Sequence, residues 1–196
     1  MDRRSGPRSF DPVLVGNRET DAWAAYYRHE WRPFLVAAVG MVREGFGMNR
    51  RRTLLASWYV LRANQKWAPY PDNDPAAARE LMRKFYSLVV RDAGLDLDPV
   101  RASELEVEWW RLHREHQHDA AVEGAALVQA LVDLYSYVYS AEPESMRPAA
   151  AARVEAMDLS DRWVEAGCRI DDPLLAAERQ ALVASYTALR WVVSRP

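Results

Sequence analysis

The residues best suited to chemistry gather in one stretch, Ser103 to His118, with the sequence SELEVEWWRLHREHQH. This stretch holds three of the four histidines in the chain, together with four glutamates and two adjacent tryptophans. Imidazole and carboxylate groups are common ligands of zinc and iron(II), and they are also common proton donors and acceptors in enzymes. The stretch is therefore the first candidate for a metal centre or a proton-transfer site.

On a helix, at about 100° per residue, these side chains divide into three faces. The first face is apolar and comprises Leu105, Trp109, Leu112 and His116. The face beside it comprises Glu106, Trp110, His113 and Gln117. The third face, which we expect to meet water, comprises Glu104, Glu108, Arg111 and Glu115. Because an exposed Trp110 would present a large apolar surface to water, we expect the second face to line an internal or half-open polar space.

Two interpretations of the second face remain open. In the first, Glu106, His113, His116 and His29 from the first helix bind iron or zinc. In the second, no cofactor is bound, and these side chains form a structural network with partners from other helices. Buried polar groups require such partners, and an arginine or a tyrosine could supply them.

The Glu-x6-His spacing of Glu106 and His113 resembles the first ligand helix of the haem-oxygenase-like diiron oxidases. In that family a second helix supplies another glutamate, and a third helix carries a His-x3-Asp-x2-His pattern. The resemblance covers one helix of this chain, and no histidine follows His118. It implies iron as the cofactor and oxidation of a small apolar molecule as the activity.

A second notable stretch runs from Val60 to Pro75, VLRANQKWAPYPDNDP, and resembles an all-helical actinobacterial family to which no activity is attached. It places amide and aromatic side chains at a helix end and in a loop stiffened by prolines. Such a loop is a suitable rim for a pocket or a partner site. The predicted rim residues are Asn64, Gln65, Trp67 and Tyr70, with Trp110 and Gln117 from the later stretch.

Helix starts are marked by an Asp-Pro pair in three places, where the aspartate caps the helix and proline occupies its first position. These pairs predict helices over 75–92, 99–118 and 173–193. Helical spacing of apolar residues predicts others over 51–67, 122–139 and 148–166, the first with Leu54, Trp58, Leu61 and Gln65 on one face. A buried helical segment is expected over 34–46.

These elements predict an all-α fold, a compact single-domain bundle of seven or eight helices over 19–196. Residues 1–18 are expected to form an irregular arm, with Thr20 as the cap of the first helix. The lone Cys168 excludes a disulfide framework and is typical of a reducing, cytoplasmic setting. No apolar run is long enough to span a membrane.

A net charge of −2 argues against nucleic acid as a partner. The chain carries eight tryptophans and nine tyrosines, which are common in pockets and interfaces. We therefore expect a non-enzymatic helical module that binds a protein partner, itself or a small apolar ligand through an aromatic-rich surface or pocket. The alternative is the metal-dependent oxidase.

Overall fold

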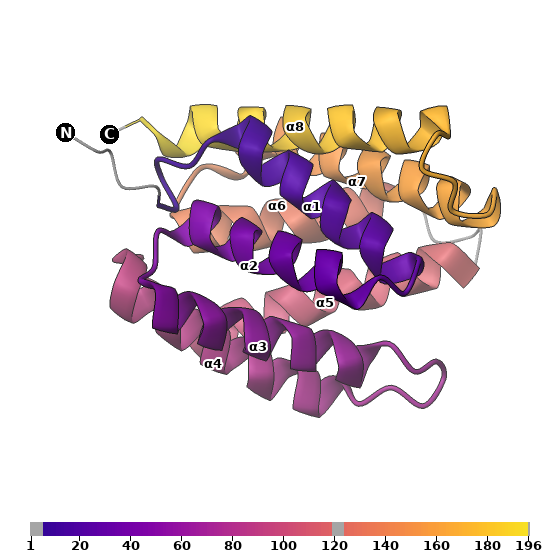
Figure 1. The fold of residues 1–196 in the computed structure, drawn as a ribbon. Coiled ribbons are helices and arrows are strands. Elements are labelled where there is room, and N and C mark those ends of the chain that lie inside the picture. Colours follow the sequence, from indigo (N-terminus) through magenta and orange to yellow (C-terminus); the bar gives the residue numbers. More distant parts are fainter. Residues whose placement is uncertain (1–5, 119–123, 196) are drawn as a thin grey trace. The chain divides into compact units, whose positions relative to one another are not determined.

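The computed structural model describes residues 6–118 and 124–195 (Figure 1). These residues form eight helices and no strand, so the expected all-α fold is confirmed. The helices are α1 (Pro12–Tyr27), α2 (Trp31–Phe46), α3 (Arg50–Trp67), α4 (Pro75–Ala93), α5 (Pro99–His118), α6 (Gly124–Tyr139), α7 (Pro143–Glu165) and α8 (Pro173–Val193). Within the described ranges, none of them is long and apolar enough to cross a membrane.

Contacts between helices divide the chain into two compact units. The first unit joins residues 1–47 to residues 144–196 and contains α1, α2, α7 and α8, apart from the first residue of α7. The second covers residues 48–143 and contains α3 to α6. The assignment of 19–196 to a single domain stays a prediction.

Aspartate caps start the helices where the Asp-Pro pairs predicted them. Asp74 Oδ1 accepts a hydrogen bond from the amide of Ala77 at 3.0 Å. Asp98 Oδ1 accepts one from Val100 at 2.9 Å, and Asp172 Oδ1 accepts one from Leu174 at 2.8 Å. The helix starts at residues 75, 99 and 173 are thereby confirmed.

A fourth Asp-Pro pair corrects the expected N-terminal arm. Asp11 caps α1 through the amides of Val13 and Leu14, at 2.9 and 3.1 Å, and the helix begins at Pro12 rather than near Thr20. Thr20 lies within the helix, fully buried, and its hydroxyl donates to the carbonyl of Gly16 at 3.3 Å. The irregular segment therefore ends before residue 12, because the Asp11 cap satisfies amides that a helix start leaves free.

In the first unit, α1 packs against α2 and against α8 (Figure 1). The approach of α1 to α8 is close at Gly16, where an added Cβ would lie 2.9 Å from Val183 Cγ2 and 3.0 Å from the Val183 amide nitrogen. A hydrogen bond of 2.8 Å from Ser185 Oγ to the Ala149 carbonyl joins α8 to α7. Small and polar residues thus set the spacing of these helices.

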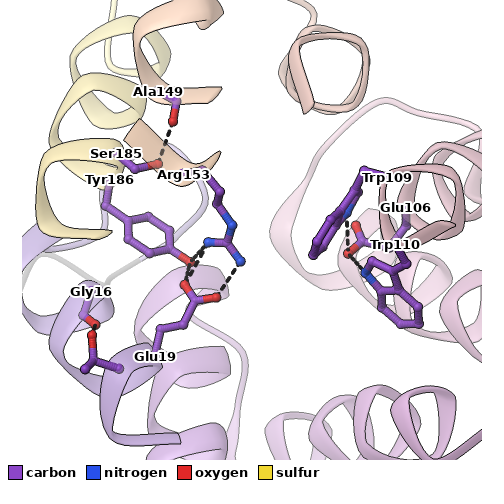
Figure 2. Close-up of polar contacts among 10 residues, drawn as sticks. Gly16, Glu19, Glu106, Trp109, Trp110, Ala149, Arg153, Ser185 and Tyr186 are labelled. Atoms are coloured by element: carbon purple, nitrogen blue, oxygen red, sulfur yellow. Dashed lines mark hydrogen bonds and ion pairs between the residues drawn. The ribbon is translucent and has the colours of Figure 1, made fainter. Parts of the chain in front are cut away.

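A buried ionic cluster also joins α1, α7 and α8 (Figure 2). The Arg153 guanidinium forms two hydrogen bonds to the carboxylate of Glu19, and the Tyr186 hydroxyl donates to Glu19 Oε2 at 2.5 Å. Glu178 on α8 is 1% exposed, and its Oε2 has no hydrogen-bond partner among the described residues. Burial, and then the charge of Glu19, raise the pKa of the Glu178 carboxyl to about 8.

The segment over 34–46 is helical as expected, but the expectation that it is buried is wrong. Within α2 only Ala37 and Val42 are buried, while Leu35 and Val36 are 47% and 69% exposed. Pro33 lies in the first turn of α2, where its missing amide costs no hydrogen bond.

In the second unit, α3 packs against α4, α4 against α5 and α5 against α6. The Arg52 guanidinium on α3 forms an ion pair with Asp92 on α4, whose side chain is 8% exposed. The Tyr137 hydroxyl on α6 accepts a 3.0 Å hydrogen bond from the amide of Asp98, at the start of α5. The first contact joins α3 to α4, and the second joins the start of α5 to α6.

Candidate functional site

The carboxylate of Glu106, in the middle of α5, accepts hydrogen bonds from three side chains, of which Figure 2 shows the two tryptophans. The Tyr86 hydroxyl on α4 donates to Oε2 at 2.7 Å, and the indole nitrogens of Trp109 and Trp110 each donate to Oε1 at 3.2 Å. Burial, and then the nearby Glu106 charge, hold the pKa of Tyr86 well above its ordinary value. Tyr86 is therefore a fixed donor at neutral pH.

These contacts support the structural-network interpretation of the second face of α5, with a tyrosine as the partner from another helix. The other three members of this face, Trp110, His113 and Gln117, differ in how deeply they are buried. Trp110 is 7% exposed and its ring lies 6.0 Å from that of Trp67. His113 is half-buried, with its ring 6.4 Å from that of Trp109, and Gln117 is exposed. Of this face, Glu106 and Trp110 thus share one hydrogen-bonded network with Tyr86 and Trp109.

The predicted metal ligands are distributed over both units. His29 follows α1 in the first unit, with a positive φ of 59° and its ring 5.8 Å from that of Trp31. Glu106, His113 and His116 lie on α5 in the second unit. Over residues 6–118 and 124–195, no group of three or more His, Cys, Asp or Glu side chains is placed to hold a metal ion. The iron or zinc site stays a prediction.

A groove of about 320 Å³ lies on the opposite side of α5. Its walls are the end of α3, the loop over 68–74, the start of α4 and the charged face of α5. Its lining residues are Trp67, Tyr70, Asn73, Pro75, Arg79, Glu104, Val107, Glu108, Arg111, Arg114 and Glu115. All of them belong to the second unit.

The loop of this groove is held at both ends and at its tip. At its ends, the amide of Asp74 donates to the carbonyl of Lys66 at 2.9 Å. At its tip, the ring of Tyr70 stacks on that of His118, with centroids 4.6 Å apart and planes 16° from parallel. The Arg114 guanidinium lies 5.6 Å from the centre of the same tyrosine ring. The loop therefore presents Tyr70, which is 59% exposed, next to the last turns of α5.

Most of the charges in the groove are already paired. Arg111 binds Glu108 at 2.7 Å and also pairs with Glu115, so that the pKa of Arg111 is raised and that of Glu108 is lowered. Glu104 pairs with Arg101 at 3.1 Å. These pairs lie on the surface and contribute little to stability. Their effect is to hold one wall of the groove in an ordered pattern of alternating charge.

Two further arginines line the groove, and the charge of one of them, Arg79, helps to lower the pKa of Glu108. The Arg79 Nε donates to the carbonyl of Pro75 at 3.3 Å, and the Arg114 guanidinium lies over Tyr70. Neither forms an ion pair with a carboxylate among the described residues. A guanidinium presents several donors in a planar fork that suits carboxylates and phosphates. The groove thus offers two such forks beside an exposed aromatic ring.

The predicted rim is brought together only in part. Trp67 and Tyr70 line the groove. Asn64 and Gln65 are exposed outside it: Asn64 Nδ2 donates to the Val60 carbonyl at 2.9 Å, and Gln65 Oε1 accepts from Arg62 at 2.8 Å. The Glu/Arg face of α5, expected to meet water, instead forms a wall of the groove. Alternating charges on a helix have the same pattern in a groove as in open solvent, so no local signal could separate the two.

No family model, no curated protein and no solved structure matches this chain. The groove is therefore interpreted from its own residues and their contacts. These residues supply recognition groups: an exposed aromatic ring, two guanidiniums and a wall of paired charges.

Proposed function

We propose that the protein is a non-enzymatic helical binding module and that the groove beside α5 holds a segment of a partner protein. The observation that carries the proposal is the pairing of exposed Tyr70 with Arg114, a guanidinium that forms no ion pair among the described residues. Tyrosine and arginine are enriched among the residues that dominate binding energy at protein interfaces.

The size and lining of the groove favour a polypeptide segment over a small apolar ligand. Its volume is at the low end of ligand pockets, and sites for small apolar molecules are lined mainly by apolar side chains. Here six of the eleven lining residues are arginines or glutamates. A segment that carries an acidic side chain could bind Arg79 or Arg114 and still place an apolar group against Tyr70.

Site-specific photo-crosslinking tests the proposal. A photoreactive amino acid is placed at Asn73, inside the groove, and separately at Val100, which is 48% exposed on α5 and does not line the groove. We expect a protein species from a lysate of the source cells to be captured from position 73 and not from position 100. Tyr70→Ala and Arg114→Ala, each introduced into the position 73 protein, should abolish that capture.

Stability measurements accompany the capture experiment, because a loss of capture is informative only in a folded protein. Tyr70 and Arg114 contribute few buried contacts, so both variants should melt within a few degrees of the parent protein. Equal capture from both positions, or capture that survives both substitutions, would overturn the proposal.

A further inference from the structure

The α3 helix buries several small residues and leaves three large apolar residues, Leu54, Leu55 and Trp58, exposed. Thr53, Ala56 and Ala63 are at most 1% exposed. On the other side, Leu54 and Trp58 are 51% and 54% exposed. A surface helix ordinarily buries its large apolar side chains, so an outward face of this composition indicates a binding surface.

The same helix carries basic residues at both ends and no acidic residue. Between Arg50 and Trp67 the sequence contains four arginines and one lysine and no acidic residue, in a chain whose net charge is −2. One of the arginines, Arg52, is paired with Asp92. The other basic side chains are exposed and form no ion pair among the described residues; they are Arg50, Arg51, Arg62 and Lys66.

The basic and apolar side chains share one face and are ordered along the helix axis. At about 100° per residue, the exposed basic residues and the exposed leucines and tryptophan fall within a sector of roughly 160°. Arg51 and Arg62 flank Leu54 and Trp58 and lie about 16 Å apart along the axis. The Arg62 guanidinium is 5.7 Å from the centre of the Trp58 ring. The apolar middle is therefore bracketed by cations at both ends.

We propose that this outward face of α3 binds the surface of an anionic lipid bilayer. The helix lies parallel to the bilayer plane, Leu54 and Trp58 enter the headgroup boundary, and the arginines bind lipid phosphates. Helices that lie in a bilayer interface combine Lys and Arg with Trp and Leu in this way, and tryptophan favours the boundary because its ring is amphipathic. Anionic lipids attract each nearby basic side chain.

The composition of the face favours lipid over an acidic protein partner. Charged residues as a class are depleted from the centre of protein interfaces, whereas a bilayer of anionic lipid attracts every nearby cation and accepts many cations of one sign. The face is also the convex side of a single helix. A flat bilayer can contact such a face, whereas a protein partner would need a complementary groove. The proposal is independent of the groove beside α5 and concerns a different set of residues.

Sedimentation with lipid vesicles tests the proposal on the full chain. The probes are vesicles of phosphatidylcholine alone and vesicles in which phosphatidylserine makes up about one third of the lipid. We expect binding to the second kind only, weakening as salt is raised. Charge reversal in the double variant Arg50→Glu/Arg51→Glu should weaken binding at least tenfold. Replacement of the apolar residues in Leu54→Ser/Trp58→Ser should weaken it to a similar extent.

Matched controls test whether vesicle binding depends on this face of α3 or on any exposed aromatic side chain. Trp191→Ser on α8 removes a tryptophan that is 65% exposed and should leave vesicle binding unchanged. Quenching of tryptophan fluorescence by spin-labelled lipid should be lost in Trp58→Phe and kept in Trp191→Phe. The substituted side chains are exposed, so the melting temperatures of all variants should stay close to that of the parent protein.

Three outcomes would overturn the proposal. The first is the absence of sedimentation with phosphatidylserine vesicles. The second is sedimentation that survives both double substitutions. The third is retention of the protein on immobilised polyglutamate without any binding to vesicles, which would assign the face to an acidic protein instead.

Discussion

The Tyr86 hydroxyl on α4 donates a 2.7 Å hydrogen bond to Glu106 Oε2 on α5. This bond gives Glu106, a candidate metal ligand, a partner from a neighbouring helix. It joins two neighbouring helices in the second unit. With the two indole donors of Trp109 and Trp110, it engages both oxygens of the carboxylate. Glu106, one of the predicted metal ligands, is thus the centre of a hydrogen-bonded network.

Tyr86→Phe should lower the free energy of unfolding by about 2 kcal/mol, because it removes a hydrogen bond to a carboxylate. Urea denaturation of the parent protein and the variant measures the change. The control is Tyr59→Phe, since the half-buried Tyr59 makes no hydrogen bond through its hydroxyl among the described residues. An equal, small effect of both substitutions would show that the Glu106 network contributes nothing to stability.

His113→Ala separates the network from the predicted iron or zinc site. In a network, the variant loses stability whether or not metal is added, because the ring packs beside Trp109. In a metal site, the variant loses bound metal and the stabilisation that metal gives, while the apo fold survives. We expect the first result, measured by thermal melts with and without Fe(II) and Zn(II). Elemental analysis of the untagged protein showing stoichiometric metal that His113→Ala removes would contradict it.

Removal of the helix caps should destabilise each helix start. Asp98→Ala and Asp172→Ala should each lower the free energy of unfolding by about 1 kcal/mol, because each leaves an amide without its acceptor. Asp171→Ala is the matched control: it lies beside Asp172 and forms only an exposed ion pair with Arg169. Chemical denaturation should show a much smaller effect of Asp171→Ala. If Asp172→Ala instead removed an activity at unchanged melting temperature, the capping role would be wrong.

Gly16→Ala should destabilise the first unit, whereas Gly45→Ala should not. A Cβ at position 16 would lie 3.0 Å from the Val183 amide nitrogen, which is backbone and cannot move aside cheaply. Overpacking of this kind costs about 1–3 kcal/mol. No atom lies within 4 Å of a Cβ at Gly45, inside α2, so alanine there should raise stability by up to about 1 kcal/mol. Differential scanning calorimetry of the two variants should show shifts of opposite sign.

Glu178 should make stability depend on pH. Its pKa rises from an ordinary value of 4.5 to about 8 in the folded protein, so the folded state holds a proton that the unfolded state releases. Its contribution to stability is full below pH 4.5 and falls by about 1.4 kcal/mol per pH unit until pH 8. Glu178→Gln removes this dependence and should be more stable than the parent protein at pH 8.

Urea denaturation of the parent protein and the Gln variant at several pH values measures the difference. Glu80→Gln, at an exposed position, provides the control. The hydrogen bond from Arg83 lowers the pKa of Glu80 to about 2, so this carboxyl group does not titrate between pH 4.5 and 8. Parallel pH profiles for the parent protein and Glu178→Gln would show that this carboxyl stays ionised when buried.

The sequence alone determined that the chain is helical and where α4, α5 and α8 begin, but α7 begins at Pro143 rather than at 148. Caps and glycine ends act through neighbouring backbone groups, so their signals are local. Asp74, Asp98 and Asp172 therefore predicted three helix starts, and the same signal at Asp11 was present but overlooked. Helical spacing also ranked burial within α5 correctly, since Trp109 is more buried than Glu108 and His116 more than His118.

Tertiary structure decided which face of each helix meets another helix. Helical spacing shows which side chains share a face, but the packing partner decides whether that face is covered. On α3 the face with Leu54 and Trp58 is exposed because α3 turns Ala56 and Ala63 inward. On α5 the charged face became a groove wall because the loop that carries Tyr70 docks against His118, and both residues come together only when the chain folds.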